Sequence, residues 1–317
     1  MRIVVIGAGG TGGYFGGLLA RAGEDVSFLA RGTQLEALRT RGLTVKSHHA
    51  GTFSLPVHAT SDPQEIGPVD LVLFCVKTYD TQAASEGLHL FMGPQTVVLP
   101  IQNGIDAAEQ LSGEVGMQHL VGGVAYVTSH IESPGVIAQT AGARSIELGE
   151  LAGGQSERTE RLQQVLRHAG ISAQLPPDIR VTLWEKFLFI CAFSGITALT
   201  RLPLGQVLAY PETSELLKAV MKEGEAVSRA SGMLCLLISL SGAMRRCRRW
   251  NRRRWGRWPL ICWPGVGWKS RPSMGRWCAW GKSTACPYRS ITPFMRHSSR
   301  IPMEHSGEYE RSWNTSG

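Results

Sequence analysis

Cysteine is scarce over most of this sequence, and no run of apolar residues is long enough to cross a membrane. Cys75 and Cys191 are the only cysteines before residue 234, and the five later ones show no paired CxxC spacing, which argues against a zinc site. The most apolar stretch, residues 187–193, is far shorter than the roughly 20 residues that a membrane helix needs. The start, MRIVVIGAGG, lacks the basic and apolar segments of a signal peptide. We therefore expect a cytoplasmic protein with no metal and no membrane span.

Acidic residues are absent from one long stretch, residues 234–303. The segment after residue 233 holds 16 of the 33 Lys and Arg residues and eight of the nine Trp, but only 3 of the 25 Asp and Glu. A basic, aromatic segment can bind nucleic acid, and residues 245–257 are its most basic part. It has no recognisable motif and no helical or strand periodicity, so we expect no nucleic-acid partner.

The length of 317 residues exceeds what one small core needs and fits a two-domain enzyme. Short apolar runs that end at glycine or polar residues predict strands, and residues 14–22 between the first two runs have helical spacing that stops at Gly23. Strands that alternate with helices imply a doubly wound, parallel sheet of the α/β class. The predicted strands are residues 2–6, 25–30, 43–47, 70–76 and 96–100.

A glycine-rich motif follows the first predicted strand and opens the first predicted helix. Glycines with the spacing GxGxxG permit a tight turn and a close approach of the backbone to a pyrophosphate, and the N-terminus of the helix favours the negative charge. The sequence therefore predicts a dinucleotide-binding Rossmann domain. Its predicted cofactor-binding residues are Gly7, Ala8, Gly9, Gly10, Thr11 and Gly12.

The type of dinucleotide depends on the residue at the end of the second strand. An acidic residue there would bind the ribose 2′-hydroxyl of NAD, but this chain has Arg31 in the segment Phe28-Leu29-Ala30-Arg31-Gly32. A guanidinium group suits a 2′-phosphate. We therefore predict that Arg31 binds NADPH in preference to NADH.

The later part of the chain changes from strands to helices. Residues 122–129 and 136–149 are strand-rich around the turn Ser133-Pro134-Gly135, and helical periodicity follows at 157–169, 178–199 and 212–231. We expect an NADPH-binding domain at residues 1–170, the beginning of a mainly helical substrate domain at 171–233, and a separate tail at 234–317.

Several short motifs connect these elements to a known family. They are GAGGTGG at the start, Cys75-Val76-Lys77-Thr78 after the fourth strand, Gln102-Asn103-Gly104 after the fifth, the PGVI and LGE stretches, Trp184-Glu185-Lys186, and Leu199-Thr200-Arg201. Over residues 1–233 the sequence resembles the ketopantoate reductases (2-dehydropantoate 2-reductases). The resemblance implies NADPH-dependent reduction of 2-dehydropantoate to pantoate in pantothenate and coenzyme A biosynthesis, by a monomer or homodimer.

The chemistry of such a reduction needs few side chains. Hydride goes to a ketone carbon, and the developing alkoxide needs a proton or a cation. Lys186 precedes an apolar helical segment, where partial desolvation would lower its pKa, and the resemblance gives it the role of the general acid. Lys77 and Asn103 follow the fourth and fifth strands, at the sheet edge where open α/β folds bind ligands, and the resemblance places both near nicotinamide and substrate.

Two positions leave the substrate open. Ketopantoate reductases carry asparagines four and eight residues after the catalytic lysine, whereas this chain has Ile190 and Ser194. Ile190 cannot hydrogen-bond a hydroxyl or a carboxylate. The alternatives are a related reductase of another small 2-oxo acid, or a non-catalytic NADPH-binding protein.

The tail after residue 233 has the signature of a shifted reading frame. Trp and Met each have a single codon, so they fix what a shifted frame must encode. In the frame that joins the third base of each codon to the first two bases of the next, four residue pairs determine the amino acid. These pairs are Trp268-Lys269, which gives Glu, Met274-Gly275, which gives Gly, Trp277-Cys278, which gives Val, and Trp280-Gly281, which gives Gly. The resulting pattern, E-x-x-x-x-x-G-x-x-V-x-x-G, is the spacing of the family's substrate-binding segment. We predict a frameshift near residues 232–236, and a disordered, aggregation-prone tail in the chain as printed.

Overall fold

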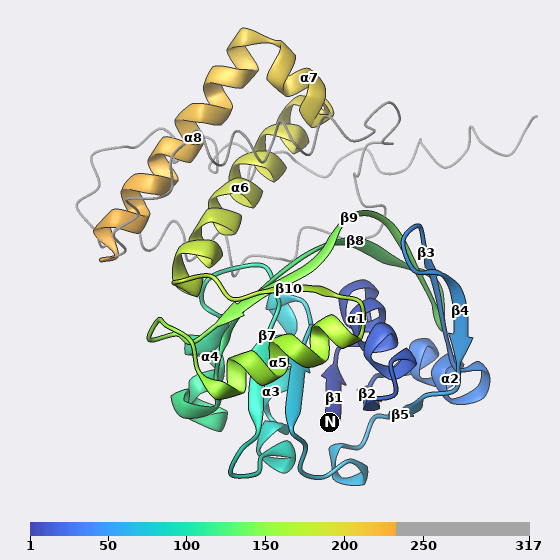
Figure 1. The fold of residues 1–317 in the computed structure, drawn as a ribbon. Helices are drawn as coiled ribbons and strands as arrows, with labels where there is room; N and C mark the ends of the chain where they lie inside the picture. The colour runs from blue at the N-terminus through green and yellow to red at the C-terminus, as the bar shows by residue number, and fades with distance from the viewer. Residues whose placement is uncertain (233–317) are drawn as a thin grey trace, which may run out of the picture.

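The structure is a computed structural model that describes residues 1–232 and contains two β-sheets with α-helices packed between and beside them (Figure 1). The predicted tail at residues 234–317 lies outside the described residues. Almost all of the segment 232–236, where we predict the frameshift, lies outside them too. Within them, the architecture is the predicted one, a parallel sheet with helices followed by a mainly helical segment.

The first sheet is parallel and contains four of the five predicted strands. The strands at residues 2–6, 71–74 and 97–100 are almost continuously buried, and this agrees with their unbroken apolar sequences. All four strand pairs in this sheet are parallel. The order is β5 (His58–Thr60), β2 (Asp25–Leu29), β1 (Arg2–Ile6), β6 (Leu71–Phe74) and β7 (Val97–Pro100).

The predicted third strand exists, but its placement in the doubly wound sheet was wrong. β3 (Leu43–Ser47) pairs in parallel with β9 (Val136–Gly149), with Thr44 opposite Val136, and antiparallel with β4 (Gly51–Leu55). It therefore belongs to a second sheet, and the three-residue β5 takes the edge position in the first. The second sheet has the order β10 (Ser172–Gln174), β9 (Val136–Gly149), β3 and β4 (Gly51–Leu55), and β8 (Gly122–Ser133) also pairs with β9.

Helix α1 (Gly10–Arg21) lies between the two sheets, and its glycines permit this close packing. A Cβ atom at Gly16 would come within 2.7 Å of the Phe28 ring in the first sheet, and one at Gly13 within 2.7 Å of Ile137 in the second. Larger residues would push the layers apart. The main core contains buried side chains from α1 and from both sheets.

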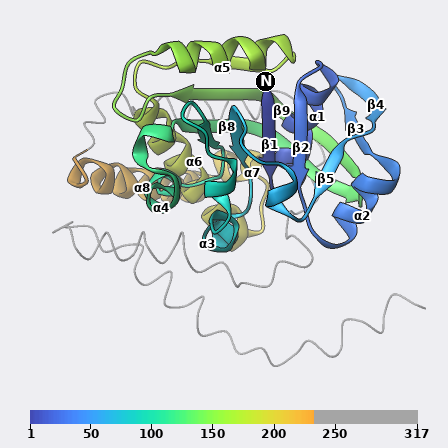
Figure 2. The ribbon, with the colours of Figure 1, turned by 90° about the horizontal axis from the view of Figure 1, so that it is seen from below.

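The remaining helices of the first half cover the outer faces. Ser156 is the N-cap residue of α5 (Glu157–His168). Its side chain accepts a hydrogen bond from the backbone N–H of Thr159, and the Thr159 side chain accepts one from the backbone N–H of Ser156. The helix lies beside β9 and β10 (Figure 2). The others are α2 (Gly32–Arg41), α3 (Thr81–Ser85) and α4 (Ala107–Val115), with 3₁₀ turns at Pro63–Glu65, Thr78–Asp80, Leu88–Phe91 and Met117–His119.

Three helices, α6 (Ile179–Thr200), α7 (Leu204–Ala209) and α8 (Pro211–Ala230), complete the described chain and project from the two sheets in Figure 1. Their bounds agree with the predicted helical segments to within two residues, except for the short α7. By length and composition α6 could cross a membrane, with a mean hydropathy of 1.4, but core helices of soluble proteins pass the same test. It packs against α8 and β8. The absence of a membrane span stays a prediction.

Candidate functional site

The glycine-rich loop is a tight backbone cradle between β1 and α1. Gly7 has a φ of 96°, which favours glycine, and a Cβ there would lie 2.9 Å from the backbone nitrogen of Val76, two residues after the end of β6. A Cβ at Gly12 would collide with the carbonyl oxygen of Gly7. α1 begins at Gly10, so its first N–H groups lie at this loop, as an anion site requires. The loop therefore fits a pyrophosphate, which the sequence predicted.

The second sheet supports this loop from the opposite side. The side-chain amide of Gln34 on α2 donates a hydrogen bond to the carbonyl of Ala8 (2.9 Å) and accepts one from the backbone N–H of Gly135 (3.0 Å). A Cβ at Gly10 would come within 2.5 Å of the carbonyl oxygen of Ser129 on β8. The contacts of Gln34 have no signature in the sequence, because its two hydrogen-bond partners lie 26 and 101 residues away along the chain.

Arg31 lies where β2 ends and α2 begins. The backbone N–H of Gly7 points at the carbonyl of Leu29 (3.4 Å), so the ends of β1 and β2 meet there. Arg31 is the N-cap residue of α2, and its side chain is exposed. The position lies beside the glycine-rich loop, and the contact of Arg31 with a 2′-phosphate stays a prediction.

Lys77 and Asn103 follow neighbouring strands, β6 and β7. Gln102 connects the two strand ends, because its side-chain nitrogen donates to the carbonyl of Val76 (2.8 Å) and to the hydroxyl of Thr81 (3.0 Å). Burial lowers the pKa of Lys77 from its usual value. Asn103 is exposed. The structure thus brings both residues to the same sheet edge as the glycine-rich loop.

Lys186 lies near the N-terminal end of α6 and reaches β8. Its Nζ donates a hydrogen bond to the carbonyl oxygen of Ala125 (2.6 Å) and lies 5.6 Å from the centre of the Tyr126 ring. Burial lowers the pKa of the ammonium group to about 8, and the negative charge of Glu147 opposes this shift only in part. Lys186 therefore loses its proton more readily than an exposed lysine, and its role as a general acid stays a prediction.

α6 is anchored to the same sheet edge by apolar contacts. Ile105, two residues after Asn103, packs against a buried cluster that includes Trp184, Phe187 and Leu188 of α6. The helix that carries Lys186 is thereby fixed to the loop that carries Asn103. This packing brings the second, helical part of the chain against the predicted cofactor site.

Ile190 and Ser194 lie one and two turns beyond Lys186 on α6. Residues at this spacing share one face of a helix. Ile190 is partly buried and Ser194 is exposed. The face that continues from Lys186 therefore presents an apolar side chain first and a small hydroxyl second.

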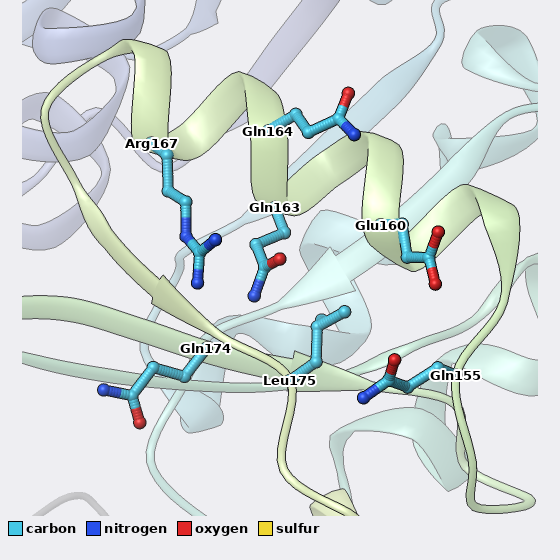
Figure 3. Close-up of a pocket in the computed structure, with 7 residues that line it drawn as sticks. All are labelled: Gln155, Glu160, Gln163, Gln164, Arg167, Gln174 and Leu175. Atoms are coloured by element: carbon cyan, nitrogen blue, oxygen red, sulfur yellow. The ribbon is translucent and has the colours of Figure 1, made fainter.

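A surface hollow of about 400 Å³ lies elsewhere, between α5 and β10, and Figure 3 shows its lining side chains. None of the predicted site residues lines it. Within residues 1–232 no group of three or more His, Cys, Asp or Glu side chains could hold a metal ion. The hollow is lined by Gln155, Glu160, Gln163, Gln164, Arg167, Gln174 and Leu175.

Both a curated protein and a solved structure that resemble this chain are named 2-dehydropantoate 2-reductases. A 2-dehydropantoate 2-reductase of Archaeoglobus fulgidus is 34% identical over 232 residues, which cover 73% of this chain and 75% of that protein. The crystal structure of 2-dehydropantoate 2-reductase from Geobacter metallireducens has a TM-score of 0.72 and 34% identity, covering 78% of this chain and 83% of that one. A D-mandelate dehydrogenase solved with NADH and anilino(oxo)acetate has a TM-score of 0.71 at 18% identity, covering 78% and 79%, and shows the fold alone.

Two family models match the chain. The model "Ketopantoate reductase PanE/ApbA" matches residues 3–153, which include the glycine-rich loop and the ends of β6 and β7. The model "Ketopantoate reductase PanE/ApbA C terminal" matches residues 178–249, which include Lys186. Together they span more than half of the sequence and the residues that form the site. The chain therefore belongs to the ketopantoate reductase family.

Proposed function

We propose that this protein reduces 2-dehydropantoate to pantoate with NADPH, in the cytoplasm, as an enzyme of pantothenate and coenzyme A biosynthesis. The observation that carries the proposal is Lys186, whose ammonium group is desolvated and fixed by the carbonyl of Ala125. Family membership supports the reaction type. The functional residues are proposed from their positions in the fold.

The glycine-rich loop and Arg31 would hold the cofactor. Residues 7–12 would take the pyrophosphate against the N-terminus of α1, and the Arg31 guanidinium would contact the 2′-phosphate. When bound, NADPH supplies the hydride. Lys77 and Asn103, at the ends of β6 and β7, would orient the nicotinamide and the substrate.

Lys186 would donate the proton. As hydride reaches the carbonyl carbon, negative charge develops on the oxygen, and a nearby ammonium group stabilises it and then transfers a proton to it. A pKa of about 8 lies close to neutral pH, which is where a general acid is most effective. The hydrogen bond to Ala125 fixes the position of the Nζ atom before the substrate arrives.

Ile190 favours a second candidate, a reductase of another small 2-oxo acid. It lies one helical turn from Lys186 and offers no hydrogen bond, so a substrate with an apolar branch and no hydroxyl group suits this face. A non-catalytic NADPH-binding protein is the third candidate, because the predicted frameshift removes the family's substrate-binding segment from residues 234–317. We also propose the domain division 1–170, 171–233 and 234–317, and a monomer or homodimer.

The first experiment is to resequence the gene across codons 228–240, then to assay the chain as printed and any frame-restored chain. Each is given NADPH and either 2-dehydropantoate or a panel of other 2-oxo acids, and NADPH oxidation is followed by absorbance. The proposal expects turnover of 2-dehydropantoate that Lys186→Met abolishes, whereas Lys218→Met, at a partly exposed position of α8 that pairs with Glu215, leaves it unchanged. Preference for another 2-oxo acid would establish the second candidate. NADPH binding without turnover of any acid by either chain would establish the third.

A further inference from the structure

A second hollow, of about 350 Å³, lies at the end of α1 that is remote from the glycine-rich loop. Four basic side chains from four different elements line it. They are Arg21 from the last turn of α1, His49 from the turn between β3 and β4, Arg144 from β9, and His168 from the last turn of α5. No carboxylate is among the lining residues, so the hollow carries unbalanced positive charge.

None of these four side chains forms an ion pair in the described part of the chain. Arg21 donates to the carbonyl of Ala50 (2.9 Å) and lies 4.6 Å above the centre of the Phe53 ring. These contacts hold the guanidinium in place and leave its charge without an acidic partner. Arg21 and His168 lie in the last turns of helices, where the helix dipole favours a basic side chain even without an acidic partner. This reason does not apply to Arg144 or His49, which lie outside helices.

The backbone around Arg144 is unusual for a strand. Between the pairs Tyr126–Ser145 and Thr128–Ala141, β8 contributes one residue and β9 contributes three, which is a bulge. Arg144 has a φ of 41°, a left-handed conformation that costs energy for any residue except glycine. Bulges of this kind redirect side chains. A charged residue in a strained backbone conformation, with its side chain lining a basic hollow, is a candidate for binding a ligand.

The hollow is separate from the proposed cofactor site. α1 has 12 residues, so its two ends are about 18 Å apart at 1.5 Å per residue. The glycine-rich loop lies at the N-terminal end, whereas the hollow lies at the C-terminal end. A ligand here would not overlap the pyrophosphate of a bound dinucleotide.

We infer that this hollow binds a small phosphorylated anion, held by the guanidinium groups of Arg21 and Arg144 and by hydrogen bonds from His49 and His168. Guanidinium groups suit phosphate oxygens because they form paired, charge-assisted hydrogen bonds. The volume accommodates a small molecule with one or two phosphate groups. The inference does not depend on the proposed reductase activity, because binding can be measured without turnover.

The test is calorimetric titration of the full chain with inorganic pyrophosphate, compared with Arg144→Gly and His49→Gln. We expect saturable binding to the parent, and a dissociation constant at least tenfold weaker in Arg144→Gly. Glycine tolerates a φ of 41°, so this variant should have a melting temperature no lower than the parent's. Arg161→Gln removes one charge from the exposed face of α5 and should bind as the parent does.

Three results would overturn the inference. The first is no binding at millimolar pyrophosphate. The second is binding that is equal in the parent, Arg144→Gly and His49→Gln, which would place the anion at the glycine-rich loop instead. The third is unfolding of Arg144→Gly together with unchanged binding in His49→Gln, which would make Arg144 a structural residue.

Discussion

The protonation of Lys186 gives a direct test of the site. Its pKa is lowered from 10.5 to about 8, a shift that corresponds to about 3 kcal/mol of unfavourable free energy for the charged form in the folded protein. The unfolded chain binds the proton up to a pH near 10.5, whereas the folded chain loses it near 8. The unfolded state therefore holds more protons between these pH values, and folding stability attributable to Lys186 must rise with pH across this window.

Comparison with Lys186→Met isolates this effect, because methionine fills similar volume without a charge. Below pH 8 the parent carries the full desolvation penalty, offset by the hydrogen bond to Ala125. As the pH rises from about 8 to 10.5, the stability of the parent relative to Lys186→Met should increase by about 3 kcal/mol. Urea unfolding at several pH values measures the difference, and NMR of side-chain ¹³Cε in labelled lysine measures the pKa itself. Loss of one signal in Lys186→Met assigns the resonance.

A midpoint near 10.5 in the NMR titration would contradict the desolvation of Lys186, since it would mean that water reaches the Nζ atom. A stability difference that does not change with pH would do the same. Lys218, which pairs with Glu215 on the exposed surface of α8, provides the internal comparison. The ¹³Cε chemical shift of Lys218 should change over a different pH range from that of Lys186.

Three further predictions concern the rest of the fold. Gly12→Ala should lower the free energy of unfolding by about 1–3 kcal/mol, because its Cβ would meet the Gly7 carbonyl. Gly9→Ala is the control: its Cβ has no atom within 4 Å, so this variant should unfold in urea as the parent does. Gln34→Leu removes the bonds to Ala8 and Gly135 and should weaken NADPH binding about tenfold in a fluorescence titration; unchanged affinity would show that the loop needs no support from α2. The pKa of Glu150 is held low chiefly by its hydrogen bond from Arg158, so Arg158→Met should be less stable than the parent by about 1–2 kcal/mol above pH 4.5, and this difference should shrink as the pH falls below that. The carbonyls of Gln118 and Leu120 also lose a hydrogen bond from Arg158, so part of the difference persists in acid; a difference that does not change with pH at all would contradict the assignment.

Local sequence patterns were sufficient for much of the fold. The unbroken apolar strands β1, β6 and β7 and the periodic helices α5, α6 and α8 lie at their predicted places, because each pattern reflects burial that the element itself experiences. The glycine-rich loop was also predictable, since its function depends on consecutive residues.

Pairing between distant segments was not predictable in the same way. β3 alternates Leu43 and Val45 with polar residues, a sign of a strand with one buried face, but nothing local shows that Thr44 pairs with Val136. For the same reason, the site was predicted as single residues, and the groups that fix them were missed. The carbonyl of Ala125, which accepts the Lys186 hydrogen bond, belongs to the backbone and has no signature in the sequence.

The position of α1 between two sheets has a consequence for synthesis on the ribosome. Its Gly13 packs on Ile137, and β3 pairs with β9, so the oldest part of the chain completes its contacts only when residues up to about 149 have emerged. At about 5–20 residues per second, the first helix waits on the order of ten seconds for its second layer. Until then an apolar face of the nascent chain is open to chaperones.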